Sequence, residues 1–169
     1  LALATDVTEL TAARRRAEEL AEALAGNEQF LRGMADAIPA QVAYWDRGLH
    51  CRFANSAFTA WYGRRADEMP GLALADLVDA QRLDGIRAQC EAALNGERQD
   101  FEVEAQRPGE PPTHLLASLV PHRVHGEVQG FIAIATDVSR LKRVERQLAQ
   151  TNVELERRAE QAESATRAK

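Results

Sequence analysis

The chain has 169 residues, a formal net charge of −5, and a composition that is 45% hydrophobic and 28% charged. This allows one globular core together with extended helices. Acidic and basic residues are interspersed, which excludes a basic stripe of the kind that binds nucleic acid. The apolar runs are far shorter than a bilayer span, and two cysteines are too few for a disulfide framework, so we expect a cytoplasmic segment without membrane contact.

The N-terminal part is predicted to be helical. Apolar residues recur every seven positions, as in a short coiled-coil seam: Leu10, Ala17, Leu24 and Leu31. Gly26 and Asn27 interrupt the pattern, and Asn27 is a suitable N-cap for a second helix over residues 28–37, which Pro39 would end.

Short strands and helices follow. Two strands joined by a connection containing Gly48 predict a hairpin, over residues 41–46 and 50–54. We expect short helices over residues 56–62 and 73–78. Asp79 can cap a longer amphipathic helix that ends at Asn95 and Gly96. Three further strands are expected, over residues 99–107, 113–120 and 130–138.

Because strands and helices occur in separate blocks, the sequence predicts an α+β fold with a five-stranded antiparallel sheet and helices on one face. Both faces of the last predicted strand are apolar, with Phe131 on one side and Ile132 on the other. Such a strand must be covered twice. The helix over residues 28–37, or a partner subunit, can cover the second face.

The last strand runs directly into a charged helix through Asp137, Val138 and Ser139. Ser139 can act as the helix N-cap, and Asp137 can place a carboxylate beside the positive helix start. We therefore expect Asp137 and Ser139 to form one mechanical joint between strand and helix. Residues 1–10 align without gaps on residues 132–141. Together with the missing initiator Met, this repeat suggests that the chain starts in the last strand of a preceding copy in a longer tandem protein.

Several motifs resemble those of a known family. The run from Phe53 to Phe58, Gly71 after an acidic turn, and the closing Asp137-Val138-Ser139 are similar to a Per-ARNT-Sim (PAS) domain of a bacterial sensor histidine kinase. The resemblance implies three parts: the end of a preceding PAS copy and a linker helix at 1–27, a PAS domain at 28–138, and a C-terminal signalling coiled-coil helix at 139–169. It implies a sensory and signal-relay function within a two-component system.

PAS domains bind haem, flavin, small metabolites or nothing. Cys51 is predicted in a strand rather than in the helix that carries the reactive cysteine of flavin photosensors, and the long helix contains no histidine for haem. We therefore predict no cofactor and a colourless protein, although an unknown small molecule is compatible with the family. A pocket is expected between the long helix and the sheet, lined by Tyr44, Phe53, Trp61, Cys90 and Leu119.

Neither a metal site nor a catalytic site is predicted. His122 and His125 are three positions apart, but they are expected in an exposed turn without a third ligand of clear spacing. No phosphate-binding glycine loop and no nucleophile motif occurs in the sequence, so this segment is not predicted to be an enzyme.

The C-terminal helix repeats apolar residues at heptad spacing: Leu141, Leu148, Leu155 and Ala162. A parallel homodimer through the flanking helices is therefore expected. The final residues, 165–169, resemble the run that leads into the dimerisation and phosphoacceptor domain of a histidine kinase. A diguanylate cyclase as output, a ligand-free structural dimerisation domain and a cofactor-bearing sensor remain as alternatives.

Overall fold

The structure is a computed structural model that describes residues 2–107 and 109–167, with side chains described for residues 10–107 and 109–161. Its elements, in chain order, are α1 (Ala2–Asp36), β1 (Gln41–Asp46), β2 (Cys51–Ala54), α2 (Ser56–Tyr62), the 3₁₀ helix η1 (Ala66–Glu68), α3 (Leu74–Leu77), α4 (Ala80–Leu94), β3 (Gln99–Ala105), β4 (Thr113–Val124), β5 (Glu127–Asp137) and α5 (Ser139–Arg167).

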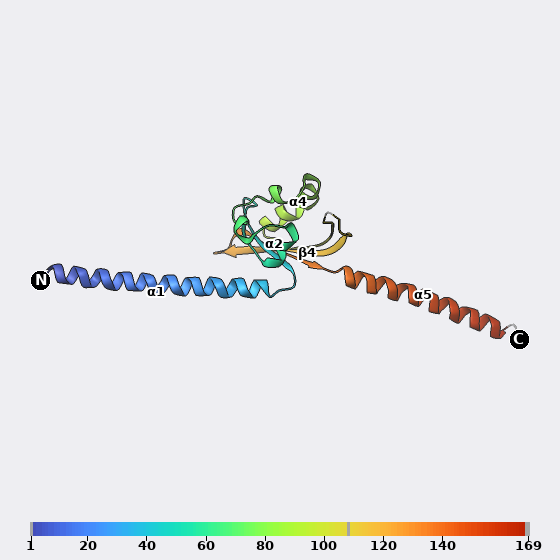
Figure 1. The fold of residues 1–169 in the computed structure, drawn as a ribbon. Helices are drawn as coiled ribbons and strands as arrows, with labels where there is room; N and C mark the ends of the chain where they lie inside the picture. The colour runs from blue at the N-terminus through green and yellow to red at the C-terminus, as the bar shows by residue number, and fades with distance from the viewer. Residues whose placement is uncertain (1, 108, 168–169) are drawn as a thin grey trace.

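The five strands form one antiparallel sheet in the order β2-β1-β5-β4-β3, with β5 at its centre. In Figure 1, α2 and α4 lie on one side of this sheet, and the long helices α1 and α5 extend away from it in opposite directions. This confirms the predicted α+β class, the five-stranded antiparallel sheet and the two flanking helices.

The core lies between the inner face of the sheet and the helices α2 to α4. Trp45 on β1 and Phe131 on β5 are cross-strand partners and are almost completely buried. Phe58 of α2 meets Trp45 edge to face, with ring centroids 6.3 Å apart. Aromatic pairs of this kind contribute beyond the area that they bury. These three side chains therefore fix α2 against the centre of the sheet.

The short helices begin and end largely as predicted. Asp79 caps α4 by accepting a hydrogen bond from the backbone N–H of Arg82 at 2.9 Å, which satisfies one of the unpaired donors of the first turn. Gly63 ends α2 with a φ of 62°, a left-handed conformation that glycine adopts without steric cost. Gly63 therefore fixes the end of α2, and Asp79 fixes the start of α4.

α1 differs from the prediction because it is one continuous helix through Gly26 and Asn27. A glycine inside a helix costs about 1 kcal/mol relative to alanine, and the surrounding alanine, leucine and glutamate residues favour the helix enough to absorb this cost. Asn27 is therefore not an N-cap. The helix also includes Ala2 to Asp6, where a strand was expected. A helix satisfies its backbone hydrogen bonds locally, whereas a strand needs neighbours, and no described strand of this chain pairs with this segment.

The last two strands are longer than predicted. β4 extends to Val124 and β5 begins at Glu127, so their connection contains only His125 and Gly126, both with positive φ (52° and 88°). This is the backbone geometry of a tight hairpin turn. The sequence predicted a loop at Pro121, because proline has no backbone N–H to donate to a neighbouring strand. Pro121 nevertheless lies on β4, at a position beyond the end of β3 where β4 pairs with β5 alone.

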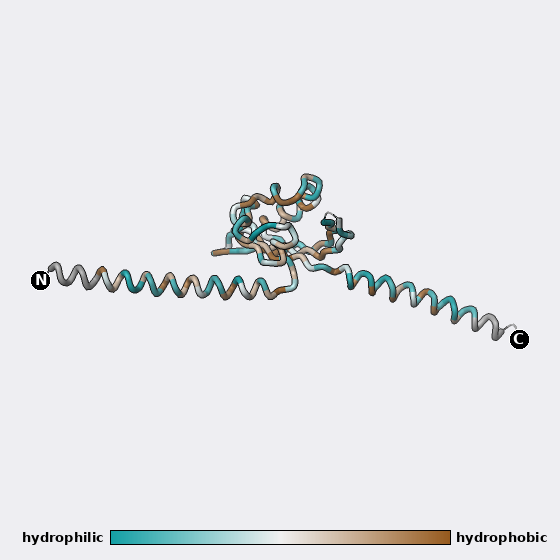
Figure 2. Tube along the Cα trace, in the orientation of Figure 1, coloured by the Kyte–Doolittle hydropathy of each residue, from teal (hydrophilic) through white to brown (hydrophobic). Residues whose placement is uncertain are grey.

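Large apolar side chains are exposed along both long helices, including Leu24 (71%) on α1 and Leu148 (61%) on α5. Figure 2 shows hydrophobic positions distributed among hydrophilic ones along each helix, with α5 the more hydrophilic of the two. None of the helices that the structure describes is long and apolar enough to cross a lipid bilayer.

Candidate functional site

A partly open internal cavity of about 90 Å³ lies between α4 and the inner face of the sheet. Trp45, Phe131 and Ala117 contribute to its wall from the sheet, and Ile86 and Cys90 contribute from α4. Almost all of the lining is apolar. The volume is smaller than the cavity of about 150 Å³ that accommodates benzene in a protein core, so only a few atoms fit into it.

Three polar side chains border the cavity: Gln41 from β1, Tyr62 from α2 and Arg82 from α4. Burial raises the pKa of Tyr62, and the positive charge of Arg82 partly offsets this rise. The phenol is therefore neutral at physiological pH and is suited to hydrogen bonding rather than to ionic contact. α4 carries no histidine that could serve as an axial ligand of haem.

The five residues predicted to line a pocket are divided between separate places. Cys90 and Leu119 line the internal cavity. Tyr44 and Phe53 are cross-strand partners on the opposite face of the sheet, because side chains alternate along a strand and Trp45 takes the inward position. Trp61 lies beneath the guanidinium of Arg107, whose carbon is 4.9 Å from the ring centroid. The structure therefore does not bring these residues together.

Tyr44 belongs to a shallow depression of about 430 Å³ on the outer face of the sheet, with Val42, Phe53 and Ile132. Its hydroxyl is 3.0 Å from Nδ1 of His122, and the two rings meet edge to face. The prediction that His122 lies in an exposed turn is wrong, because this residue is on β4. His125, in contrast, is in the turn. Extending the alternating pattern through Pro121 would have located His122 correctly.

Both cysteines are buried. Burial raises the pKa of Cys90 to about 11 and also raises the pKa of Cys51, whose thiol donates a hydrogen bond to the carbonyl oxygen of Phe53 at 3.3 Å. Because the thiolate is the reactive form, both groups are chemically quiet near neutral pH. They are core residues of the PAS domain.

The second candidate site is the C-terminal junction, which we define as Asp137, Val138, Ser139 and their partner His114. Oδ1 of Asp137 accepts a hydrogen bond from the backbone N–H of Ser139 at 2.8 Å. Oγ of Ser139 accepts one from the backbone N–H of His114 on β4 at 2.9 Å, and Val138 N–H donates to the carbonyl of His114, also at 2.9 Å. The junction therefore joins the start of α5 to two strands.

The role of Ser139 thus differs from the one expected from the sequence. Val138 provides the first carbonyl of the helix, which accepts from the N–H of Lys142 at 2.9 Å, so it occupies the cap position that was assigned to Ser139. Asp137 satisfies a helix N–H, and Ser139 binds the neighbouring strand. The sequence could not reveal this exchange, because His114 is far away along the chain.

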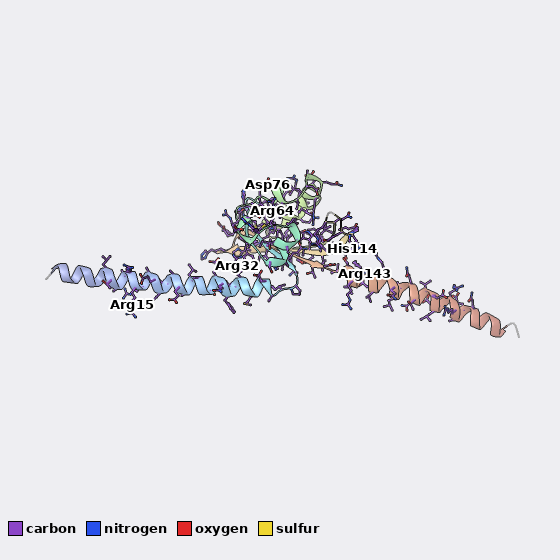
Figure 3. The ribbon with its side chains drawn as sticks, viewed as in Figure 1. Arg15, Arg32, Arg64, Asp76, His114 and Arg143 are labelled. Carbon is purple, nitrogen blue, oxygen red and sulfur yellow. The ribbon has the colours of Figure 1, made fainter. Side chains whose placement is uncertain are left out.

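Electrostatic interactions of the Asp137 carboxylate also stabilise the C-terminal junction. Hydrogen bonds from the side chain and backbone of Ser139 hold the pKa of Asp137 below its usual range, and the charges of Arg143 and His114 lower it further. Figure 3 shows His114 and Arg143 close to the point where α5 leaves the sheet. Asp137 is therefore ionised at neutral pH, where its negative charge lies beside the positive end of α5.

A third contact point holds α1, and we call it the N-terminal attachment: Asn55 with Ala35 and Ala40. The amide of Asn55 donates to the carbonyl oxygens of Ala35 (3.0 Å) and Ala40 (2.9 Å). Its oxygen accepts from the N–H groups of Val42 and Phe58, both at 2.9 Å. Asn55 has 0% exposure. One buried side chain therefore connects the end of α1 with β1 and α2.

Residues 35–143 match the family described as the PAS fold. This match covers more than half of the chain. The chain belongs to the PAS family. Its elements agree with this assignment, since the sheet, the central helices and the C-terminal junction all fall within the matched residues. No curated protein sequence matches the chain.

Solved structures give the same fold. A domain of an HTR-like protein from Haloarcula marismortui ATCC 43049 is 16% identical with a TM-score of 0.51, and the alignment covers 60% of this chain and 100% of that one. The PAS domain of Bordetella pertussis BvgS is 20% identical with a TM-score of 0.56, covering 76% and 98%. Vibrio cholerae VqmA is 18% identical with a TM-score of 0.59, covering 68% and 52%. This PAS chain thus spans about half of VqmA.

Within the described ranges 2–107 and 109–167, no group of three or more His, Cys, Asp or Glu side chains is arranged to hold a metal ion. The candidate sites described in this PAS domain are a small, mainly apolar cavity and a hydrogen-bonded junction.

Proposed function

We propose that this PAS domain is the sensory and signal-relay module of a multidomain histidine kinase, passing a conformational change from its core to a dimeric output helix, α5. The observation that carries the proposal is the continuity of β5 and α5. β5 lines the cavity through Phe131 and Ala133, and only Val138 separates its end from the start of α5. A shift of the central strand therefore moves the helix directly.

The dimeric part of the proposal rests on the exposed apolar side chains of the long helices. Leu141, Leu148 and Leu155 are each more than half exposed at heptad spacing on α5, and Leu10, Leu24 and Leu31 are similarly exposed on α1. A parallel homodimer would bury both rows. Ala162 and Ala165 continue the α5 pattern but lie outside the described side chains. Residues 1–27 are proposed as the end of a preceding PAS copy with its linker helix.

Sedimentation equilibrium tests the dimer. We expect a dimer at micromolar concentration, and a Leu148→Glu/Leu155→Glu variant should be monomeric because charges would enter the seam. Glu145→Gln/Glu156→Gln, which changes exposed positions of the same helix, is the control. A wild-type monomer at high micromolar concentration would contradict the proposal.

The relay itself is tested with the double variant Asp137→Ala/Ser139→Ala in the full-length protein. It removes the side-chain bonds of the C-terminal junction and leaves the apolar faces of the PAS core untouched. We expect altered basal autophosphorylation or an altered response, with an unchanged circular dichroism spectrum and dimer. Asp76→Ala/Ser56→Ala, an exposed pair of the same residue types away from the junction, is the matched control. Unchanged output in the folded junction variant would mean that the joint is only structural.

Two alternatives make different predictions. A diguanylate cyclase as the output domain would give the same dependence on the junction, read as cyclic dinucleotide synthesis rather than as phosphorylation. A ligand-free structural dimerisation domain is favoured by the small volume of the cavity, and it would retain normal output when the junction is changed. The junction variant therefore separates a relay from a purely structural role.

A further inference from the structure

Lys142 and Glu102 connect α5 to the edge of the sheet. Lys142 is in the first turn of α5 and Glu102 is on β3, 40 positions earlier. Nζ of Lys142 lies 2.7 Å from Oε1 of Glu102, which is a direct charged hydrogen bond. The C-terminal junction involves β4 and β5, so this ion pair adds a contact with a third strand.

Glu102 lies on β3 between two residues whose side chains face the other side of the sheet. Phe101 and Val103, its neighbours in sequence, line the internal cavity. Because side chains alternate along a strand, Glu102 points to the opposite face, where it meets Lys142. A displacement of β3 that starts at the cavity therefore moves the carboxylate that holds α5.

β3 is also better able to move than the central strands. It is at the edge of the sheet and pairs with β4, whereas β5 is hydrogen bonded to β1 and β4 on both sides. An edge strand gives up one ladder when it shifts, and a central strand gives up two. Phe101 is the cross-strand partner of Ala117, whose small side chain also borders the cavity.

Both members of the pair are charged at neutral pH. The hydrogen bond from Lys142 lowers the pKa of Glu102, and the charge of His114 lowers it further. The same bond raises the pKa of Lys142, with the charge of Glu145 adding to the rise and that of Arg146 opposing it. The pair is substantially exposed, with side-chain exposures of 30% for Lys142 and 61% for Glu102. Exposed ion pairs add little to folding stability, so this contact is better suited to orienting α5 than to stabilising the core.

We propose that Glu102 and Lys142 form a latch that carries movements of β3 at the cavity to α5, and that Lys142 is a positioning residue of the relay. This inference rests on the proposed relay function and adds a second route to it, beside the direct route from β5. The latch sets the direction in which α5 leaves the sheet. It opens and closes without unfolding either element.

Pulsed electron–electron distance measurements test the latch in the full chain. Spin labels are attached at Ala88→Cys on α4 and Ala149→Cys on α5, both exposed, and labelled chains are mixed with excess unlabelled chains so that only distances within one chain are read. Glu102→Gln and Lys142→Gln should each lower the ratio of docked to undocked α5 by about 1.5- to 5-fold, seen as a broader distance distribution. The charge swap Glu102→Lys/Lys142→Glu should restore the narrow distribution.

Glu154→Gln is the matched control, because Glu154 pairs with Arg157 and Arg158 within α5. It should leave the distribution unchanged. High salt should broaden the distribution of the wild type towards that of Glu102→Gln, since exposed charges are screened. Unchanged distributions in both single variants, or a charge swap that does not restore the narrow one, would overturn the latch.

A variant at the cavity tests the coupling. Ala117→Leu adds side-chain volume beside Phe101, and we expect it to shift the distance distribution in the wild-type background. The shift should be smaller when Lys142→Gln is also present. An equal shift with and without Lys142 would overturn the latch as a route from the cavity.

Output activity separates this inference from the proposed function. If Asp137→Ala/Ser139→Ala changes output while the Lys142 variants change neither distance nor output, the latch is wrong and the relay stands. If the Lys142 variants broaden the distances and no variant changes output, the contact is real and the relay is wrong. Altered distances and altered output in the Lys142 variants, both restored by the charge swap, support both proposals.

Discussion

α1 has a completely buried attachment to the PAS core, the side chain of Asn55, which makes four hydrogen bonds without a net charge. The exposed carboxylate of Asp36 adds a hydrogen bond accepted from Ser56 N–H at 2.6 Å. α5 is held by Asp137, Ser139 and the pair Glu102–Lys142, which are all partly or largely exposed. The two helices are of comparable length, and both leave the same sheet. Their attachments nevertheless use different kinds of interaction.

The difference has an energetic consequence. A buried hydrogen-bonding group that loses its partner carries a full desolvation penalty, whereas an exposed group exchanges its partner for water at little cost. The N-terminal attachment is therefore strong and resists adjustment. The C-terminal junction and the latch are weak and adjustable, which suits the end of the domain that is proposed to change during signalling.

The largest expected effect is that of Asn55→Ala. It removes the partner of Val42 N–H, Phe58 N–H and the Ala40 carbonyl, while the Ala35 carbonyl keeps a bond from Ile38 N–H. The free energy of unfolding should fall by about 3 kcal/mol or more. Urea denaturation measures this change. Asn95→Ala, at an exposed helix end where the cap is made by backbone groups, is the control and should cost less than about 1 kcal/mol. Similar losses for the two variants would remove the contrast between the attachments.

An intermediate effect is expected from acid at the C-terminal junction. The pKa of Asp137 lies below its ordinary value in the folded protein. Its stabilising contribution is therefore complete at pH values above the unfolded pKa of about 3.9, and it is lost as the pH falls through the lower folded pKa. A titration followed by NMR should show this low pKa, and Ser139→Ala should raise it towards the ordinary value. A carboxyl group that titrates identically in both proteins would contradict the hydrogen bond from the Ser139 side chain to Asp137.

The smallest effect concerns Arg32 at the end of α1. Its guanidinium carbon lies 5.4 Å from the ring centroid of Phe53, and Arg32→Met keeps the aliphatic stem while removing the charge. We expect a loss of about 0.5 to 1 kcal/mol in the free energy of unfolding, measured by urea denaturation. Arg16→Met, an exposed position earlier on α1, is the control. A loss as large as that of Asn55→Ala would mean that α1 is held mainly from the outer face of the sheet.

Local sequence signals predicted the parts of the fold that depend on nearby residues. Asp79 was identified as a cap because its partner is three residues away, and the strand–helix transition at Asp137 was visible from the change in periodicity. The junction partner His114 and the latch partner Glu102 were missed. Each is brought to α5 by the pairing of β3, β4 and β5, which no local pattern encodes.

The residues predicted to line one pocket are divided between separate places for a similar reason. The sequence could not determine which face of β1 is buried, because Tyr44 and Trp45 are adjacent and both are amphipathic aromatic residues. One step in register exchanges them, and with them Phe53 on the paired strand. Cys90 and Leu119 line the internal cavity because an amphipathic helix and a mainly apolar strand each define their inner side. Gly26 and Asn27 were misinterpreted for the opposite reason. Both residues locally favour the end of a helix, but the helical preference of the residues around them keeps α1 continuous.

The single residue between β5 and α5 also determines the rotational phase of everything attached to the helix. Val138 allows no slack, so the hydrogen-bond register of β5 fixes the angle at which each side chain of α5 points about the helix axis. Each residue added to or removed from α5 turns the following segment by about 100° and moves it by about 1.5 Å along the axis. A change in the length of α5 by one heptad returns the helix to within about 20° of its original angle. Only such changes keep the orientation of an attached domain about the helix axis.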